Sequence, residues 1–432
     1  MNEIRRYIIK RAEMQGFFEN FTLEKLERYD KEVHGFTIGS IAIKYLSLLT
    51  EAVQEKRYPI YGDGVLGHSF GFEGGKRREY GIGARPNRTI EIEYTPLPRE
   101  VLEDLKTENI IIPGFVDLHC HGGKGFDTMA GLSSIKKMSE YHLAYGTTSL
   151  LPTTLTATLN DTIKALQGLN DFIDQNKSLT NILGVHLEGP FINPNKLGAQ
   201  PPQAQLPNID FIKKIKDVAK IKIITLAPEL DGADILINYL INNNINVQIG
   251  HSLADYNFCM KVMDKNKIGF THLFNAMSGY NHLHPGVVTA ALNHAEYSEI
   301  ICDLHHVNQA NIHLAHKSIP NLYAVSDAIS ACGMPDGKYD FANLKIEKKD
   351  GQALINDKTL AGSIVNMLDT FKNLIKINFS LQQAVAMTSY NAAQYLNEND
   401  KGKIDKGYCA NLLVLNQQFD IKEVYLYGNL VT

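Results

Sequence analysis

The chain has 432 residues, of which 44% are hydrophobic and 21% are charged. This composition is typical of a globular protein with a sizeable core, and it excludes a disordered or fibrous chain. The formal net charge of −4 excludes a general attraction to nucleic acid or to an anionic membrane, so local groups must hold any anionic substrate.

The five cysteines form no CxxC pair, which argues against a disulfide scaffold and against a zinc finger. The first residues carry charge throughout and lack the apolar core of a signal peptide. There is also no apolar run long enough to cross a membrane. We therefore expect a cytoplasmic enzyme whose partner is a small molecule, with no nucleic-acid or membrane partner.

Residues 1–56 are expected to form a helical N-terminal extension, because apolar residues recur there at three- and four-residue spacing. Residues 57–112 differ, since glycine-rich turns separate short segments and RTIEIEY alternates as a strand does. The tail, 400–432, also reads as turns and short strands. We expect 57–112 and 400–432 to form one small β-sandwich domain from both ends of the chain.

Between these segments, residues 113–399 show a strand–helix rhythm that begins near residue 110. Eight apolar runs are separated by helix-like stretches: IIIPGFVDLH, TTSLLPTT, ILGVHLEG, KIITLAPE, NVQIGHS, GFTHLFN, EIICDLHH and LYAVSDA. Apolar runs without alternation suit parallel strands that are buried on both faces. Eight such units predict an α/β fold of the (β/α)₈ TIM-barrel type, followed by further helices after Asp327.

Polar side chains gather where these runs end. They are Asp117, His119, His121, Glu188, Glu229, His251, His272, Asp303, His305, His306 and Asp327. The carboxyl ends of all barrel strands meet at one face, where barrel enzymes have their active sites. The sequence therefore predicts that these residues converge, although they span about 200 positions.

Glu188, His251 and His272 give two imidazoles and one carboxylate, a common ligand set for catalytic zinc or iron. His119 and His121 are two residues apart on an extended segment and can reach one ion from the same face. Each residue also fits an ordinary buried polar role, and for the HxH pair alone that alternative is equally good. Asp327 is placed to take a proton from a metal-activated water and to pass it to a leaving group.

The segments HLEGPF, IGHS, THLFNAMS, VSDAISACGMPDG and LAGS, with PGFVDLHCHGG and GFDTMAG before them, resemble the N-acetylglucosamine-6-phosphate deacetylase family of the amidohydrolase superfamily. The resemblance runs from about Ile112 to Val431. It implies a barrel with a small β-sandwich from both termini, which agrees with the strand count. Residues 1 to about 90 carry no recognisable resemblance.

The resemblance also implies roles for individual residues. Glu188, His251 and His272 would bind the principal divalent metal (zinc, iron, manganese or cobalt), and His119 and His121 a second ion, with Asp327 as the catalytic aspartate. Asn275 and Ala276 match positions at the phosphate end of the substrate, and His306 matches a substrate-binding histidine. LGAQ supplies Gly198, Ala199 and Gln200, the last at a position where many members have a substrate-contacting histidine.

One departure concerns the phosphate. Many members carry HHREPG where this chain has NHLHPG, so Leu283 replaces an arginine that in the family helps to bind phosphate across a dimer interface. The leading interpretation is hydrolysis of the acetamide of N-acetylglucosamine-6-phosphate by a homodimer. The alternatives are a deacetylase for a different or unphosphorylated N-acyl amino sugar, a cyclic-amidase relative, and a barrel kept as a non-catalytic binding module.

Overall fold

The computed structural model describes residues 109–175, 180–263, 267–341, 344–356 and 359–432, and the backbone of 68–73 and 76–81. The chain divides into two compact units, one of residues 1–113 with 403–432 and one of residues 114–402. The predicted helical extension, 1–56, lies outside the described residues. So does most of the segment 57–108 that was expected to join the β-sandwich.

The larger unit contains the predicted barrel, and all eight expected strands are present. They are β4 (Phe115–Cys120), β7 (Thr147–Thr154), β9 (Val185–Glu188), β10 (Ile221–Leu226), β11 (Asn246–Ile249), β12 (Ile268–Phe270), β13 (Tyr297–Ile301) and β14 (Asn321–Val325). Six of them pair in parallel in the order β12–β11–β10–β9–β7–β4, and β13 pairs with β14. The short strand β8 (Asn181–Ile182) pairs with β7.

Backbone hydrogen bonds close the barrel where the regular ladders stop. Leu273 N donates to Glu299 O (2.9 Å), which joins the end of β12 to β13. Asp327 N donates to His119 O (2.8 Å) and His121 N donates to Ala328 O (2.9 Å), which joins the segment after β14 to β4. The ring of strands is thus complete, and the (β/α)₈ prediction is confirmed.

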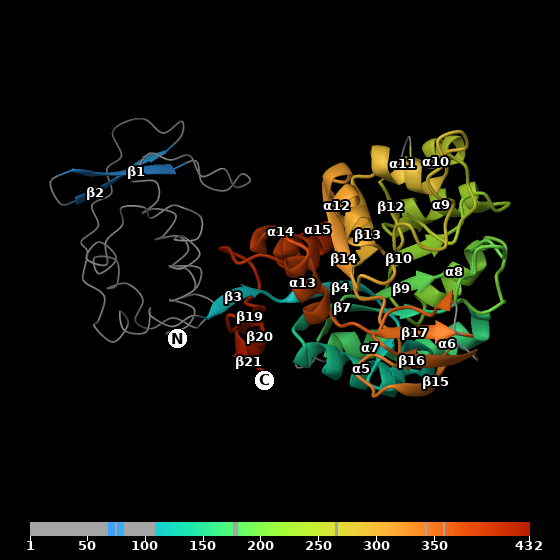
Figure 1. The fold of residues 1–432 in the computed structure, drawn as a ribbon, viewed down its shortest axis with the longest axis horizontal. Coiled ribbons are helices and arrows are strands. Elements are labelled where there is room, and N and C mark those ends of the chain that lie inside the picture. Colours follow the sequence, from blue (N-terminus) through green and yellow to red (C-terminus); the bar gives the residue numbers. More distant parts are fainter. Residues whose placement is uncertain are drawn as a thin grey trace. The chain divides into compact units, whose positions relative to one another are not determined.

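Helices connect consecutive strands and lie outside them, as Figure 1 shows for α8 to α12. The helices are α5 (Leu132–Ala144), α6 (Leu159–Leu166), α7 (Leu169–Gln175), α8 (Ile209–Lys216), α9 (Ala233–Asn242), α10 (Tyr256–Met263), α11 (Val287–His294) and α12 (Gln309–Ser318). After the strands come α13 (Met367–Lys376), α14 (Leu381–Val385), the π-turn η2 (Ala386–Tyr390) and α15 (Asn391–Tyr395). These last helices confirm the helical prediction for the segment after Asp327.

The barrel interior holds a hydrogen-bonded polar chain in addition to apolar side chains. His186 Nε2 pairs with Thr225 Oγ1 (2.7 Å), which pairs with Thr271 Oγ1 (2.6 Å). Thr271 donates to Gln248 Oε1 (2.8 Å), and Gln248 Nε2 donates to Tyr323 OH (2.6 Å). All five side chains are fully buried. Because buried polar groups are costly unless they are paired, this chain helps to fix the mutual positions of the strands that carry it.

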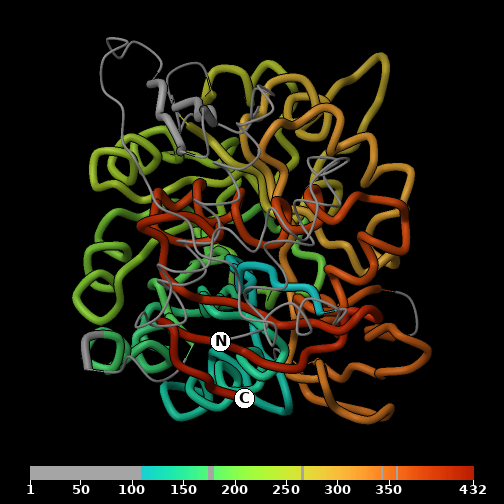
Figure 2. Tube along the Cα trace, turned by 90° about the vertical axis from the view of Figure 1, so that its left-hand side faces the viewer, coloured from blue at the N-terminus to red at the C-terminus, as the bar shows by residue number. Residues whose placement is uncertain are grey.

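A four-stranded antiparallel sheet between β14 and α13 was not predicted. It consists of β15 (Gly337–Phe341), β16 (Leu344–Lys349), β17 (Gln352–Ile355) and β18 (Thr359–Leu360). Figures 1 and 2 show it in orange along one side of the barrel. Its buried residues Phe341, Ile346 and Ala353 pack with Leu155 and Ile329 of the barrel in one apolar cluster. The sheet therefore belongs to the barrel unit and forms part of its wall.

Three short elements precede α5 in the barrel unit. They are β5 (Gly122–Gly123), β6 (Phe126–Asp127) and the 3₁₀ turn η1 (Thr128–Ala130).

In the smaller unit, one antiparallel sheet combines strands from both sides of the barrel sequence, in the order β21–β20–β19–β3. Its strands are β3 (Ile110–Pro113), β19 (Leu412–Leu415), β20 (Ile421–Leu426) and β21 (Asn429–Leu430). The first predicted apolar run thus contains two strands, since it ends in the barrel as β4 but begins here as β3. A separate hairpin joins β1 (His68–Glu73) and β2 (Lys76–Gly81).

Among the residues that the structure describes, no helix has the length and apolar character that crossing a membrane requires.

Candidate metal centre

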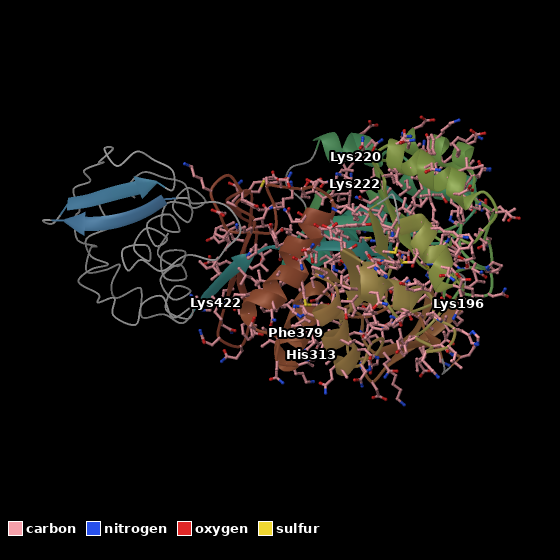
Figure 3. All side chains as sticks on the ribbon, turned by 90° about the horizontal axis from the view of Figure 1, so that it is seen from above. Lys196, Lys220, Lys222, His313, Phe379 and Lys422 are labelled. Atoms are coloured by element: carbon pink, nitrogen blue, oxygen red, sulfur yellow. The ribbon has the colours of Figure 1, made fainter. Side chains whose placement is uncertain are left out.

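The predicted ligands lie at the carboxyl end of the barrel strands. Glu188 is the last residue of β9, while His251 and His272 follow β11 and β12 by two residues each. Figure 3 labels Lys196, on the loop after β9, and Lys222, near the start of β10, and these two residues lie on different sides of the barrel unit. The backbone oxygen of Lys196 accepts a hydrogen bond from His251 Nδ1 (2.7 Å), so the cluster lies on the Lys196 side.

His251 and His272, here called the second pair, face one oxygen of Glu188. Each Nε2 atom lies 3.0 Å from Glu188 Oε1, and the two Nε2 atoms are 3.1 Å apart. All three side chains are buried. This compact set of one carboxylate oxygen and two ring nitrogens could hold one metal ion.

His119 and His121, here called the first pair, face the other oxygen of the same carboxylate. Glu188 Oε2 lies 3.2 Å from His121 Nε2 and 3.7 Å from His119 Nε2, and the two Nε2 atoms are 3.1 Å apart. Asp327 Oδ1 lies 3.2 Å from His121 Nε2 and 3.3 Å from His119 Nε2. The first pair with Glu188 could therefore hold a second ion, and Glu188 lies between the two pairs.

The hydrogen bonds of the Nδ1 atoms, which point away from the centre, show which ring nitrogen of each neutral imidazole carries the proton. Nδ1 of His119 faces Glu299 Oε1 (2.7 Å), Nδ1 of His121 faces Thr153 O (3.2 Å), and Nδ1 of His251 faces Lys196 O. These oxygens only accept, so each neutral imidazole carries its proton on Nδ1 and directs the Nε2 lone pair inward. The inner surface then consists of lone pairs and carboxylate oxygens, a donor set that fits a divalent cation.

Three of these residues have backbone conformations in the left-handed region, which non-glycine residues rarely adopt. The φ angles are 48° for His251, 28° for His272 and 47° for Asp327. Such a conformation costs on the order of 1–3 kcal/mol per residue, and it is typical of functional sites. For Asp327 the local contacts offset this cost, because its N–H donates to His119 O and its carbonyl accepts from Ser363 N (both 2.8 Å).

The carboxylates and imidazoles shift one another's pKa values. Burial lowers the pKa of His121, but hydrogen bonds to Asp327 and Glu188 outweigh burial and raise it from 6.5 to about 9. Burial raises the pKa of Asp327, but the charges of His119 and His121 outweigh burial and lower it to about 2. Burial lowers the pKa of His119, but the charges of nearby carboxylates outweigh burial and raise it well above its ordinary range. At neutral pH the metal-free centre therefore favours ionised carboxylates beside protonated His119 and His121.

We expect metal uptake to compete with these protons. An ion at the first-pair site must displace the protons on His119 and His121, so its affinity should rise by about tenfold or more per unit between pH 7 and pH 9. The folded pKa of His121, about 9, exceeds the ordinary 6.5, so protonation stabilises the metal-free fold fully below pH 6.5. That stabilisation is lost as the pH rises through 9. Calorimetry of zinc binding in two buffers of different ionisation enthalpy measures the protons released, and uptake near pH 7.5 without proton release would contradict this assignment.

Most of the predicted site residues line one cavity of 360 Å³ at this end of the barrel. Its lining includes His121, Glu188, Gly198, Ala199, Gln200, His251, His272, Asn275, Ala276, His306 and Asp327. His119 is fully buried and does not line the cavity, but its Nε2 lies 3.1 Å from His121 Nε2 and 3.3 Å from Asp327 Oδ1. The structure thus brings together, in the lining or in contact with it, every residue that the sequence singled out for metal, acid–base or substrate contacts.

Two polar side chains in the cavity are held in fixed orientations. Gln200 Nε2 donates to Glu188 Oε2, and Gln200 Oε1 accepts from Thr156 N (2.7 Å). His306 Nδ1 pairs with Asp303 Oδ2 (2.6 Å), so its Nε2 is the ring nitrogen left for a ligand. Asp303 is itself oriented by the backbone N–H groups of His305 (2.9 Å) and His306 (2.8 Å).

Sequence reasoning missed part of the cavity. Phe341, Thr359 and Leu360 reach it from the inserted sheet, and Leu155 reaches it from the end of β7. It also missed Glu299, which bonds to His119 from within β13. The available signal was a single charged residue inside the apolar run SEIIC. Leu283 is absent from the lining and is 72% exposed.

A closed (β/α)₈ barrel with imidazoles and carboxylates converging at the strand ends is the architecture of a metal-dependent hydrolase. The model of the Amidohydrolase family matches residues 110–431. The chain therefore belongs to the amidohydrolase family.

The relatives that the chain matches are named for a more specific activity than the family as a whole. The N-acetylglucosamine-6-phosphate deacetylase of Bacillus subtilis (strain 168) is 33% identical over 362 residues, covering 81% of this chain and 91% of that protein. The crystal structure of the deacetylase of the same name from Thermotoga maritima matches with a TM-score of 0.71 at 29% identity, covering 84% and 94% of the two chains. An aspartate-to-alanine variant of the Mycobacterium smegmatis enzyme, in complex with N-acetyl-D-glucosamine-6-phosphate, matches with a TM-score of 0.71 at 26% identity, covering 82% and 94%. The family resemblance noted in the sequence is confirmed.

Proposed function

We propose that this protein hydrolyses the acetamide of N-acetylglucosamine-6-phosphate to glucosamine-6-phosphate and acetate. The observation that carries the proposal is the pair of imidazole clusters around Glu188, with Asp327 on the same cavity wall. Relatives named for this reaction match the chain over most of their own length, which supports the choice of substrate.

Glu188 with the second pair would hold one ion, and Glu188 with the first pair a second, so the centre suits one or two ions of zinc, iron, manganese or cobalt. A bound ion would supply Lewis acidity, which lowers the pKa of water toward about 7 and polarises an acyl oxygen. The histidine Nδ1 contacts described above would keep the ring lone pairs directed at that ion.

Asp327 is the proposed proton carrier. Its low pKa keeps it ionised at neutral pH, so it is ready to accept a proton from the attacking water. As the C–N bond of the acetamide breaks, the same carboxyl group returns the proton to the departing amine. The water oxygen remains on the acetyl carbon, so the products are acetate and the free amino sugar.

The remaining polar residues of the cavity would bind the sugar. Gln200 lies beside Glu188 and would contact the acetamide, and Gly198 and Ala199 line the same cavity. Asn275, Ala276 and His306 would contact the end of the substrate that carries the phosphate. Ala276 has a left-handed backbone conformation (φ 50°), which marks a tightly specified turn at that wall.

The phosphate raises a specific question, because the sequence contains no arginine after Arg99. The cavity lining given above also includes neither lysine nor arginine. Phosphate would therefore be held by His306, by Asn275 and by backbone N–H groups. The alternative, which Leu283 also favours, is an N-acyl amino sugar without phosphate or of another kind.

Comparing kcat/KM for N-acetylglucosamine with and without its 6-phosphate decides between these substrates. One charge-assisted hydrogen bond is worth about 1.5–3 kcal/mol, so we expect the phosphorylated sugar to be preferred by roughly 10- to 100-fold. A preference for the plain sugar would select the alternative. A purified protein that binds no metal and hydrolyses neither sugar would instead favour the non-catalytic barrel.

A homodimer remains a prediction that light scattering of the purified chain can check.

A further inference from the structure

Glu299 is a fully buried carboxylate within β13, behind the metal centre. Its Oε1 atom accepts two hydrogen bonds, one from His119 Nδ1 (2.7 Å) and one from the backbone N–H of His272 (3.0 Å). Its Oε2 atom has no hydrogen-bond partner among the residues that the structure describes. The interactions of this carboxylate are thus concentrated on one oxygen, and that oxygen faces a predicted metal ligand.

The bond from His272 fixes where this oxygen lies. His272 is a member of the second pair and has a left-handed backbone conformation (φ 28°). His119 belongs to the first pair. One oxygen of Glu299 therefore bonds both to the backbone N–H of His272, in the second pair, and to the side chain of His119, in the first pair. The rings of His119 and His272 lie 5.6 Å apart.

Among the described residues, His186 is a neighbouring imidazole, and its ring lies 4.6 Å from that of His119. It is not free to take over the contact to His119 Nδ1. Both ring nitrogens of His186 are already engaged, Nδ1 with Leu118 O (3.0 Å) and Nε2 with Thr225 Oγ1 (2.7 Å). These bonds also argue against a separate ion held by His119, His186 and Glu299, although their ligand atoms lie close together.

We propose that Glu299 is a positioning residue that makes His119 a metal ligand and so controls occupancy of the first-pair site. The carboxylate keeps the imidazole proton on Nδ1, aims the Nε2 lone pair at Glu188 and Asp327, and increases the basicity of the ring. This inference rests on the proposed function only in treating the two pairs as metal ligands. It concerns ion binding, which can be measured whatever the substrate.

The test is zinc titration of the metal-free full-length protein and of its Glu299→Gln variant, with elemental analysis of bound zinc. Glutamine keeps the shape and one oxygen that can accept from both His272 N and His119 Nδ1, but it removes the charge that strengthens the bond to His119. Mutation of such an outer partner typically costs 10- to 100-fold in metal affinity. We expect that loss for one of two bound ions, with the affinity of the other changed by less than about threefold.

A double variant identifies which ion is affected. His121→Asn removes a first-pair ligand, so adding Glu299→Gln to it should leave the remaining ion's affinity unchanged within about threefold. The matched control is Glu229→Gln. Among the described residues, Glu229 accepts from Asn193 Nδ2 (2.8 Å), Ser252 Oγ (2.7 Å) and Leu253 N (2.6 Å), none of which belongs to a histidine. We therefore expect this variant to leave first-pair occupancy unchanged.

Three results would overturn the proposal. They are wild-type binding of only one ion at any zinc concentration, a Glu299→Gln variant that holds both ions as tightly as wild type, and equal loss of both ions. The last would indicate a purely structural role, which a lowered melting temperature of the metal-free variant would identify. Absence of deacetylase activity in a wild-type protein that binds two ions would contradict the proposed function and leave this proposal standing.

Discussion

Asp327→Asn should bind metal as the wild-type protein does and lose most of its turnover, with kcat lower by roughly 10²- to 10⁴-fold. Asparagine has the same shape but cannot accept a proton. It also tolerates the left-handed backbone that Asp327 adopts (φ 47°). The backbone of residue 327 makes its own hydrogen bonds with His119 and Ser363, and these do not depend on the side chain, so the variant should keep its fold.

Elemental analysis and steady-state kinetics on the same preparation check this expectation. Asp340→Asn is the matched control, because Asp340 is an exposed carboxylate of the inserted sheet that forms an ion pair with the exposed Lys345. It should behave as wild type. If Asp327→Asn turned over substrate at a near wild-type rate, Asp327 would not be the proton carrier. If it lost metal, the residue would act as a ligand instead.

Much of the barrel was predictable because its strands are buried on both faces. An apolar run such as LYAV signals such a strand without reference to any distant residue, and β14 occupies that segment. The polar residues at the run ends were equally accessible, because parallel strands in a barrel bring their carboxyl ends together. The convergence of Glu188 with His251 and His272 follows from the fold class alone.

The features that were missed depend on distances along the chain or on local geometry. Glu299 bonds to His119 across 180 positions, and its sequence context shows only that it interrupts an apolar run. The first run was taken as one strand, but it divides at Gly114. A Cβ atom at Gly114 would lie only 2.2 Å from Thr148 Oγ1, so the backbone at Gly114 packs directly against the side chain of Thr148. The hydrophobic pattern of the sequence does not reveal such a contact.

The inserted sheet was missed for a different reason. GKYDF alternates half-buried with exposed residues, as an edge hairpin does, and its apolar content is too low to stand out beside the barrel runs. Only Phe341 at its end is buried, and this residue packs on the barrel and reaches the cavity. The fold class does not specify such an insertion, so the part of the cavity that it forms could not be assigned from sequence.

Glu188→Gln is expected to have the broadest effect on the metal centre, because the two oxygens of Glu188 face different pairs. Oε1 lies 3.0 Å from each Nε2 of the second pair, and Oε2 lies 3.2 Å from His121 Nε2. An amide nitrogen cannot serve as a ligand, so one of the two sites loses its carboxylate outright. The other keeps only a neutral oxygen.

We therefore expect Glu188→Gln to weaken binding at both sites by at least 10- to 100-fold, the loss typical of an outer partner alone. Activity should fall by about 10³-fold or more, since Lewis-acid stabilisation of the transition state is worth several kcal/mol.

His121→Asn should instead lower zinc occupancy of the first-pair site and leave the second-pair site occupied, because His251 and His272 contact Glu188 Oε1 directly. Zinc content after dialysis against a graded chelator series distinguishes the two patterns. If Glu188→Gln retained as much zinc as wild type, Glu188 would not be a ligand shared by the two sites. If His121→Asn lost zinc from one site and Glu188→Gln lost zinc from both, Glu188 would be that shared ligand.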